Sequence, residues 1–371
     1  MQRFKVALAL AIGVIVAGET VAYACNVPVF RYALEHWRPD PYRVTVLHRG
    51  PLDEAIQQHA NILAEGEERR TINVKVRTLD VDAIADTADR ELLAALGEMS
   101  VPRIVIQYPA HLRLDQPIWT APVDSAAVQQ MVESPVRQEL VRRIIDGETA
   151  VWLLLECGDS ERDNAAATLL QEELKTLPLT LKLPQLTDSP EDVLLGGPPL
   201  RLAFSMLRVP RSETEDALVS MLLDIESDLR ELSQPLVFPV FGRGRALLPL
   251  VGPGITVENI RGTAAFLTGA CSCQVKEQNP GFDLLVSANW DELLSLEGVS
   301  LTTLGNEPAT SSAEPELVSI AEGTTEPSVE IAPTPQSATQ QSSVDGASPG
   351  WPKIAGAVGL VVVICLLIRR R

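Results

Sequence analysis

The sequence has little of what most metal and hydrolase sites need. It contains only four histidines in 371 residues, and no two of them stand at the spacing of helical metal ligands. They are His36, His48, His59 and His111. The HExxH zinc motif, the G-x-S-x-G nucleophile motif and the P-loop are all absent. These absences argue against a zinc hydrolase, a common type of serine hydrolase and a nucleotide-binding enzyme.

Positive charge is scarce in the central part of the chain. The formal charge of the whole chain is -18; residues 1–24 contribute +1 and residues 351–371 contribute +4, so residues 25–350 carry -23. A surface this acidic repels nucleic acid and anionic lipid headgroups, so we expect no nucleic-acid partner. The length and the 46% hydrophobic content are enough for two ordinary domains.

The first 24 residues have the three-part layout of a secretory signal peptide. A short basic region precedes the apolar stretch 6–18, and a small-x-small cleavage site follows at 22–24. Cleavage after Ala24 would leave Cys25 as the first mature residue. A bacterial lipoprotein also carries a cysteine there, but Tyr23 is bulkier than such signals prefer. The body is therefore expected to be exported, with lipidation of Cys25 as an alternative.

The other end of the chain predicts a membrane tail over residues 351–371. Residues 354–368 are uninterrupted and apolar, and three arginines follow them. Fifteen helical residues span about 22 Å, short of the roughly 30 Å of a bilayer core. Trp351 and Lys353 can extend this span, and the arginines would stay on the cytoplasmic side. A processed sorting signal is the alternative, although no recognisable sorting tripeptide is present.

A polar stalk is expected between the body and this tail. Residues 305–350 are rich in serine, threonine, proline and alanine, and they carry seven acidic residues but no lysine or arginine. Such a segment cannot bury enough apolar surface to fold, so it predicts a disordered, solvated linker.

The body, residues 25–304, alternates strand-like and helix-like segments, which indicates an α/β fold. Strands are expected over residues 43–49, 73–80, 101–108, 117–121, 150–156, 179–183 and 200–209. Helices are expected over residues 52–65, 86–98, 125–132, 135–146 and 160–176, and from Ser212. Ser134 has the features of an N-cap, Pro135 those of a first-turn residue, and Gly147 those of a helix stop.

Two stretches of this body resemble thioredoxin-like domains. "VKVRTLDVDA…ELLAALGEMSVPRIVIQYP" is similar to the centre of that fold, in which a Val-Pro with a cis proline opens the next strand. "QPLVFPVFGRGRALLPLVGPGITVENIRGTAAFLTG" is similar to its end. The resemblance implies two tandem domains, 25–147 and 148–304, with Pro102 and Pro235 as candidate cis prolines.

The redox motif of that family is missing from both domains. Its Cys-x-x-Cys position holds His48-Arg49-Gly50-Pro51 in the first domain, which is therefore expected to be redox-silent, as a scaffold or docking domain. In the second domain the position holds Cys157-Gly158-Asp159-Ser160, which resembles the Cys-Gly-x-Ser of monothiol glutaredoxins. A helix N-terminus favours a thiolate at Cys157, whereas acidic neighbours oppose it. The alternative is a cysteine without a role.

Cys271-Ser272-Cys273 is the most distinctive local pattern. The two thiols could form an easily reduced disulfide and act catalytically, or hold Cu(I). Each could instead pair elsewhere as a structural bridge, for instance with Cys157. No other cofactor is expected. Gly242-Arg243-Gly244-Arg245 indicates a hairpin turn, and its arginines could hold an anion or an acidic partner.

Three functions follow from these features. The preferred one is an exported, membrane-tethered module that binds partners or assists assembly in the cell envelope. Its body would be periplasmic or otherwise extracytoplasmic. The alternatives are a thiol-disulfide redox protein that uses Cys271, Cys273 and Cys157, and a copper-handling protein that uses the C-x-C pair. Whether the protein is an enzyme stays open.

Overall fold

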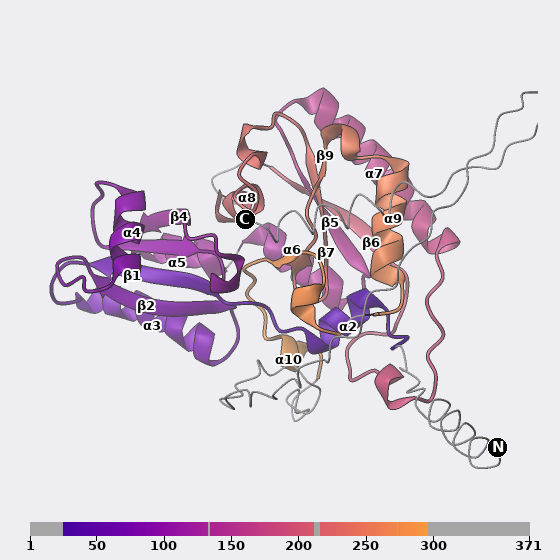
Figure 1. Cartoon of the computed structure of the whole chain (residues 1–371), viewed down its shortest axis with the longest axis horizontal. Coiled ribbons are helices and arrows are strands. Elements are labelled where there is room, and N and C mark those ends of the chain that lie inside the picture. Colours follow the sequence, from indigo (N-terminus) through magenta and orange to yellow (C-terminus); the bar gives the residue numbers. More distant parts are fainter. Residues whose placement is uncertain (1–24, 133, 211–215, 273, 296–371) are drawn as a thin grey trace, which may run out of the picture. The chain divides into compact units, whose positions relative to one another are not determined.

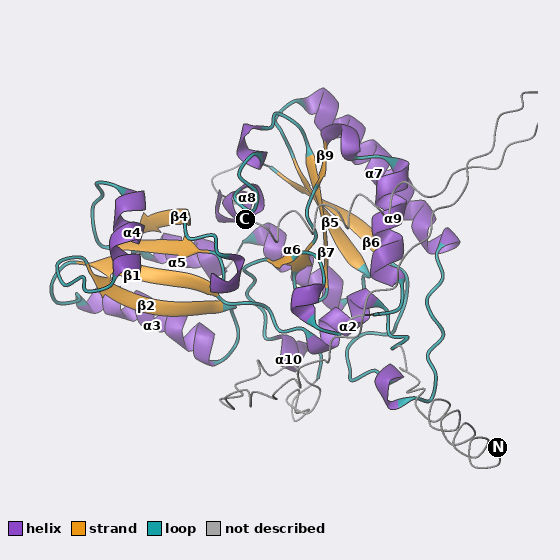
Figure 2. Cartoon of the chain, viewed as in Figure 1, coloured by secondary structure: helices purple, strands orange, loops and turns teal. Residues whose placement is uncertain are grey.

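The computed structural model describes residues 25–132, 134–210, 216–272 and 274–295 (Figure 1). The predicted signal peptide, stalk and membrane tail lie outside these residues. Within them, no helix combines the length and the apolar character that crossing a bilayer requires. The protein is a mixed α/β structure with two sheets (Figure 2).

The first sheet has the strand order β2-β1-β3-β4. It consists of β1 (Tyr42–His48), β2 (Val74–Asp80), β3 (Arg103–Gln107) and β4 (Pro117–Pro122). Strands β1 and β2 are parallel, and β3 is antiparallel to both β1 and β4. The connecting helices are α3 (Glu54–Glu68), α4 (Thr87–Leu96) and α5 (Ser125–Val132), and the short 3-10 helix η1 spans Ala110–Leu112.

Local chemistry explains where these helices begin. The Asp53 carboxylate accepts a hydrogen bond from the Ala55 amide, and Asp86 does the same for Ala88, so aspartates cap α3 and α4. The peptide bond between Val101 and Pro102 is cis, as predicted.

The second sheet has the order β10-β8-β7-β5-β6, and β9 also pairs with β7. Its strands are β5 (Ala150–Leu155), β6 (Phe204–Val209), β7 (Leu236–Phe241), β8 (Arg245–Ala246), β9 (Leu250–Val251) and β10 (Phe282–Asp283). Strands β5 and β6 are parallel, and β7 runs antiparallel to β5. The bond before Pro235 is not one of the cis bonds of the described residues, so that prediction is wrong.

Helices cover both faces of the second sheet. They are α2 (Val29–His36), α6 (Pro135–Ile145), α7 (Ser160–Thr180), α8 (Asp216–Leu223), α9 (Val257–Thr268) and α10 (Trp290–Leu293). The 3-10 helices are η2 (Pro190–Asp192), η4 (Leu229–Glu231), η5 (Gly252–Gly254) and η6 (Lys276–Gln278). Alternate residues of β5 point to opposite faces, so Trp152 joins the core beneath α2, α7 and α9, and Leu153 joins the core beneath α6 and α8.

Two helix predictions have different outcomes. Helix α6 begins as predicted, because the Ser134 hydroxyl accepts the Arg137 amide, and Gly147 follows its end with a φ of 96°. The predicted strand 179–183 is wrong, because α7 continues to Thr180. The predicted start of a helix at Ser212 lies outside the described residues.

The segment before β1 packs on the second sheet rather than on the first. The Val29 amide donates to the Gly269 carbonyl at 3.0 Å, and the Cys271 amide donates to the Val27 carbonyl at 2.9 Å. The Trp37 indole donates to the Gln274 carbonyl at 3.0 Å. The segment that precedes the first sheet in the sequence therefore contacts the part of the structure that contains the second sheet.

Candidate functional site

Cys157 lies where β5 gives way to α7, at the predicted position. The amides of Cys157 and Gly158 both donate to the Asp163 carboxylate, at 2.9 and 3.1 Å. Asp159 caps α7 by accepting the amides of Glu161 and Arg162. Two carboxylates thus occupy the donors that would otherwise stabilise a thiolate at this helix start.

The other described cysteines are buried. Cys271 is 2% exposed and Cys25 is 3% exposed, and both belong to the core beneath α2 and α9. The Cys25 thiol donates to the Glu191 carbonyl at 3.2 Å, and burial raises the pKa of this thiol. Cys25, Cys157 and Cys271 form no disulfide with one another. Cys273 lies outside the described residues, so the C-x-C pair stays a prediction.

The corresponding turn in the first sheet is held by polar contacts. The His48 ring lies 2.8 Å from the Gly50 carbonyl, and the Gly50 amide donates to Asp80 at 3.3 Å. A hydrogen bond from the Asp82 amide keeps the pKa of Asp80 below its usual value. Within the described parts of the chain, no cluster of three or more histidine, cysteine or carboxylate side chains is arranged to hold a metal ion.

The two arginines of the predicted hairpin are buried. The turn joins β7 to β8, and Gly242 and Gly244 have φ angles of 56° and 91°, so the prediction of a turn that needs positive φ is confirmed. Arg243 is 4% exposed and Arg245 is 5% exposed. Both arginines pair with carboxylates of the same chain: Arg243 with Asp291 at 2.7 Å and Arg245 with Asp283 at 3.2 Å.

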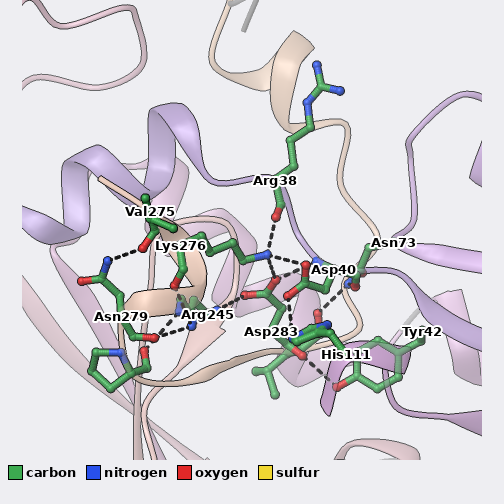
Figure 3. A network of polar contacts seen from close by, with 12 residues as sticks. Arg38, Asp40, Tyr42, Asn73, His111, Arg245, Val275, Lys276, Asn279 and Asp283 are labelled. Atoms are coloured by element: carbon green, nitrogen blue, oxygen red, sulfur yellow. Dashed lines mark hydrogen bonds and ion pairs between the residues drawn. The ribbon is translucent and has the colours of Figure 1, made fainter. Parts of the chain in front are cut away.

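Asp283 is the centre of a buried ionic network between the two sheets (Figure 3). Its carboxylate accepts the Lys276 ammonium at 2.5 Å and the Asp40 amide at 2.6 Å, besides the Arg245 guanidinium. The Asp283 carbonyl accepts the Tyr42 hydroxyl of β1 at 2.8 Å. We call Asp40, Arg245, Lys276 and Asp283 the junction network. It ties residues 38–41, which lead into β1, to β8, η6 and β10.

Burial and charge act in opposite directions on the two carboxylates of the junction network. Burial alone would raise the pKa of Asp283, but the charges of Lys276 and Arg245 outweigh it, so this pKa is lowered. Asp40 is also desolvated and lies beside Asp283, and its pKa is raised although Lys276 opposes the shift. The Lys276 ammonium lies 2.9 Å from Asp40 and also donates to the Arg38 carbonyl. As the pH falls, Asp40 is therefore expected to take up a proton before Asp283 does.

A pocket of about 310 Å³ opens next to this network. Residues of the linker before β1, the end of α3, the start of β2 and the segment around α10 line it. Four cationic side chains and two carboxylates face it: Arg38, Arg70, Lys75 and Arg243, with Glu67 and Asp291. We call it the junction pocket. Its lining carries more positive than negative charge, although the chain as a whole is strongly acidic.

Sequence reasoning missed both the junction network and the junction pocket. Asp40, Lys276 and Asp283 stand in no recognisable motif, and 243 residues separate the two carboxylates. The only signal was the pair of arginines in the β7–β8 turn. That pair indicated an acidic partner but could not indicate that the partner belongs to the same chain.

The buried side chain of His36 should make the fold less stable in acid. Burial, and then the charge of Arg243, lower the pKa of His36 to about 4. Because an unfolded histidine titrates near 6.5, the neutral ring stabilises the fold fully above about pH 6.5, and this stabilisation is lost as the pH falls towards 4. We expect a loss of about 2 kcal/mol between pH 7 and pH 4.5 from this residue.

Urea unfolding of the full chain in detergent at the two pH values would measure this loss. The His36→Gln variant should show a smaller difference between pH 7 and pH 4.5 than the native protein. The matched control is His59→Gln at a half-buried position in α3, which should leave the difference unchanged. An equal pH dependence in the native protein and in His36→Gln would refute the assignment.

Comparison with known proteins adds no name to this geometry, because neither a protein-family model nor a curated protein sequence matches the chain.

Proposed function

We propose that the protein is an exported, membrane-tethered partner-binding module of the cell envelope, built on two thioredoxin-like domains. The topology supports the two domains. In the first sheet a parallel pair at one edge, β2-β1, is extended by two antiparallel pairings in the order β2-β1-β3-β4. The path β6-β5-β7-β8 of the second sheet has the same directions.

The proposal rests on the residues at two positions. These are the positions where redox-active proteins of this fold carry their thiols. The first position contains His48-Arg49-Gly50-Pro51 and no cysteine. At the second, the carboxylate of Asp163 already takes the amides of Cys157 and Gly158. The first position holds no thiol, and at the second the amides of Cys157 and Gly158 are already bound to Asp163, so binding suits this protein better than thiol chemistry.

The junction pocket supports the proposal as a candidate binding site. Its volume falls within the range of about 300–1,000 Å³ that is usual for ligand sites. It lies where two sheets and three connecting segments meet, and interfaces of this kind are common positions of binding sites. The proposed export signal, stalk and membrane tail would hold this pocket on the extracytoplasmic side.

We predict that the protein retains its binding partner without any thiol in the body. The test uses the full chain in its source membrane, with a photo-crosslinking residue at the exposed position 293, in the helix α10 that lines the pocket. A variant in which Cys25, Cys157, Cys271 and Cys273 are all serine should give the same adduct as the native chain. The purified native protein should reduce insulin less than about twofold faster than buffer and should contain copper at far below one ion per chain.

Each alternative gives a different result in these assays. Insulin reduction that a Cys273→Ser variant abolishes would establish the redox function, and stoichiometric copper would establish the copper function. A variant without cysteines that folds but forms no adduct would also contradict the proposal. Because Cys25 and Cys271 are buried, Cys157→Ser alone, at a half-exposed position, is the control for packing damage.

A further inference from the structure

The cationic side chains of the junction pocket differ in whether a carboxylate of the same chain already pairs with them. Arg243 and Arg70 share one carboxylate, because Asp291 lies 2.7 Å from Arg243 and 3.8 Å from Arg70. The guanidinium of Arg243 also donates to the carbonyls of Leu34 and Glu35, so it is committed to the fold.

Arg38 and Lys75 have no such partner. Both side chains are exposed, and no carboxylate among the described residues forms an ion pair with either. Figure 3 shows the Arg38 guanidinium pointing away from the junction network, with only its backbone carbonyl engaged by Lys276. The remaining acid of the pocket, Glu67, accepts the Val76 amide at 2.7 Å. The pocket therefore presents two unneutralised cations from two different elements.

The rest of the lining is largely apolar. Pro39 and Pro41 contribute from the linker, Ile72 and Val74 from the first sheet, and Val286 and Trp290 from the segment after β10. Ile72, Val74, Val286 and Trp290 are each less than 5% exposed, so this wall is firmly packed. Pro39 and Pro41 are more accessible, so the linker offers apolar surface to a ligand, and the two cations favour negative charge.

We propose that the junction pocket binds a partner polypeptide segment in which two carboxylate side chains flank an apolar side chain. The inference rests on the proposed function and names the chemistry of its partner. Arg38 and Lys75 each receive one carboxylate, and the apolar side chain lies against Pro39 and Pro41. A segment with two separated carboxylates matches two cations on different elements, whereas an amphiphile with one headgroup matches only one of them.

The test is the binding of a fluorescent peptide, Gly-Glu-Leu-Glu-Gly, to the full chain in detergent. We expect the Arg38→Gln and Lys75→Gln variants each to weaken binding by about fivefold, and the double variant by about tenfold or more. The neutral peptide with glutamines should bind at least about tenfold more weakly than the acidic one. Raising the salt from about 50 to about 500 mM should weaken binding of the acidic peptide.

Two further variants separate binding from folding. Arg69→Gln is the matched control, because Arg69 is equally exposed, pairs with Glu65 and does not line the pocket, so binding should change less than about twofold. Arg70 has a φ of 56°, which glycine adopts more easily than arginine. Arg70→Gly should therefore keep or raise the urea midpoint while weakening binding about threefold.

Several outcomes would overturn the inference. They are equal binding of the acidic and neutral peptides, unchanged binding in the Arg38→Gln/Lys75→Gln variant, and binding of decanoate but not of the peptide. The proposed function has its own readout. A photo-adduct that survives removal of the cysteines, together with no peptide binding, would refute this pocket assignment alone. Loss of the adduct without cysteines would refute the proposed function.

Discussion

Replacing Asp283 with asparagine is expected to destabilise the protein by about 3–5 kcal/mol, the usual cost of stranding buried charges. Asp283 is 3% exposed, and its carboxylate is the shared acceptor for Lys276 and Arg245, which are 6% and 5% exposed. Removing its charge leaves two desolvated cations with only Asp40 nearby. Urea unfolding of the full chain in detergent, followed by tryptophan fluorescence, measures the change.

The control for this substitution is Asp115→Asn. Asp115 also pairs with an arginine, Arg43, at 2.9 Å, but its side chain is 74% exposed. We expect a loss below about 1 kcal/mol there, because solvent screens exposed ion pairs. A loss at Asp283 no larger than at Asp115 would show that the junction network does not hold the two sheets together.

The pH dependence of Asp283 can be stated with its sign. Its pKa in the folded state lies below its unfolded value of about 4. The stabilisation is therefore complete above about pH 4 and is lost as the pH falls through the lower folded pKa. The penalty of Asp283→Asn should accordingly shrink under strongly acidic conditions.

Replacing Gly281 with alanine is expected to cost about 3 kcal/mol or more, since backbone strain and overpacking add. Gly281 has a φ of 108°, and a Cβ there would lie 2.4 Å from the Ala246 carbonyl oxygen. The oxygen belongs to β8, which pairs with β10, so it cannot retreat without moving Arg245 and Asp283. Thermal and urea unfolding of the full chain measure the loss.

Substitutions at two other glycines separate the effect of backbone strain from that of steric overlap. Gly50 has a φ of 64°, but nothing lies within 4 Å of the position that a Cβ would occupy, so Gly50→Ala should cost only about 1 kcal/mol from conformation. Gly262 lies exposed within α9 with open space around it, and Gly262→Ala should stabilise by up to about 1 kcal/mol. Equal losses at Gly281 and Gly50 would rule out the steric contact as the cause.

Much of the fold could be predicted from local signals. The Ser134 cap, the Gly147 stop, the cis bond before Pro102 and the turn at 242–244 each depend on a few neighbouring residues, and all four agree with the structure. Alternating strands and helices were sufficient to indicate an α/β fold. Each of these features depends on residues that are close together in the sequence. Sequence patterns predict local structure over that range.

The wrong strand prediction concerns a segment whose structure depends on residues further away in the sequence. The alternation of Leu179, Leu181 and Leu183 is typical of a strand, but α7 already buries Leu170, Leu174 and Leu177 at helical spacing and extends to Thr180. Leu179 is then left 85% exposed. The packing of the preceding turns outweighs the local alternation.

The site could not be predicted because its members are far apart in sequence. Arg38 and Asp40 precede the first sheet, whereas Lys276, Asp283 and Asp291 follow the last long helix. A charged residue in a loop is usually solvated, so Lys276 and Asp40 carried no sign of burial. Only the folded chain shows that opposite charges from both ends of the body meet.

The position of residues 25–37 on the second sheet has a consequence for the order of folding during synthesis. These residues leave the ribosome before the rest of the described chain. The surface on which they pack includes Gly269, Cys271 and Gln274, and the hydrogen bond from Trp37 to Gln274 joins residues 237 apart. At about 5–20 residues per second, that surface is made tens of seconds later. The first sheet, whose four strands all lie within residues 42–122, can close in the meantime. Helix α2 is therefore an exposed nascent segment for that interval, and a chaperone could hold it until residues 269–274 have been made.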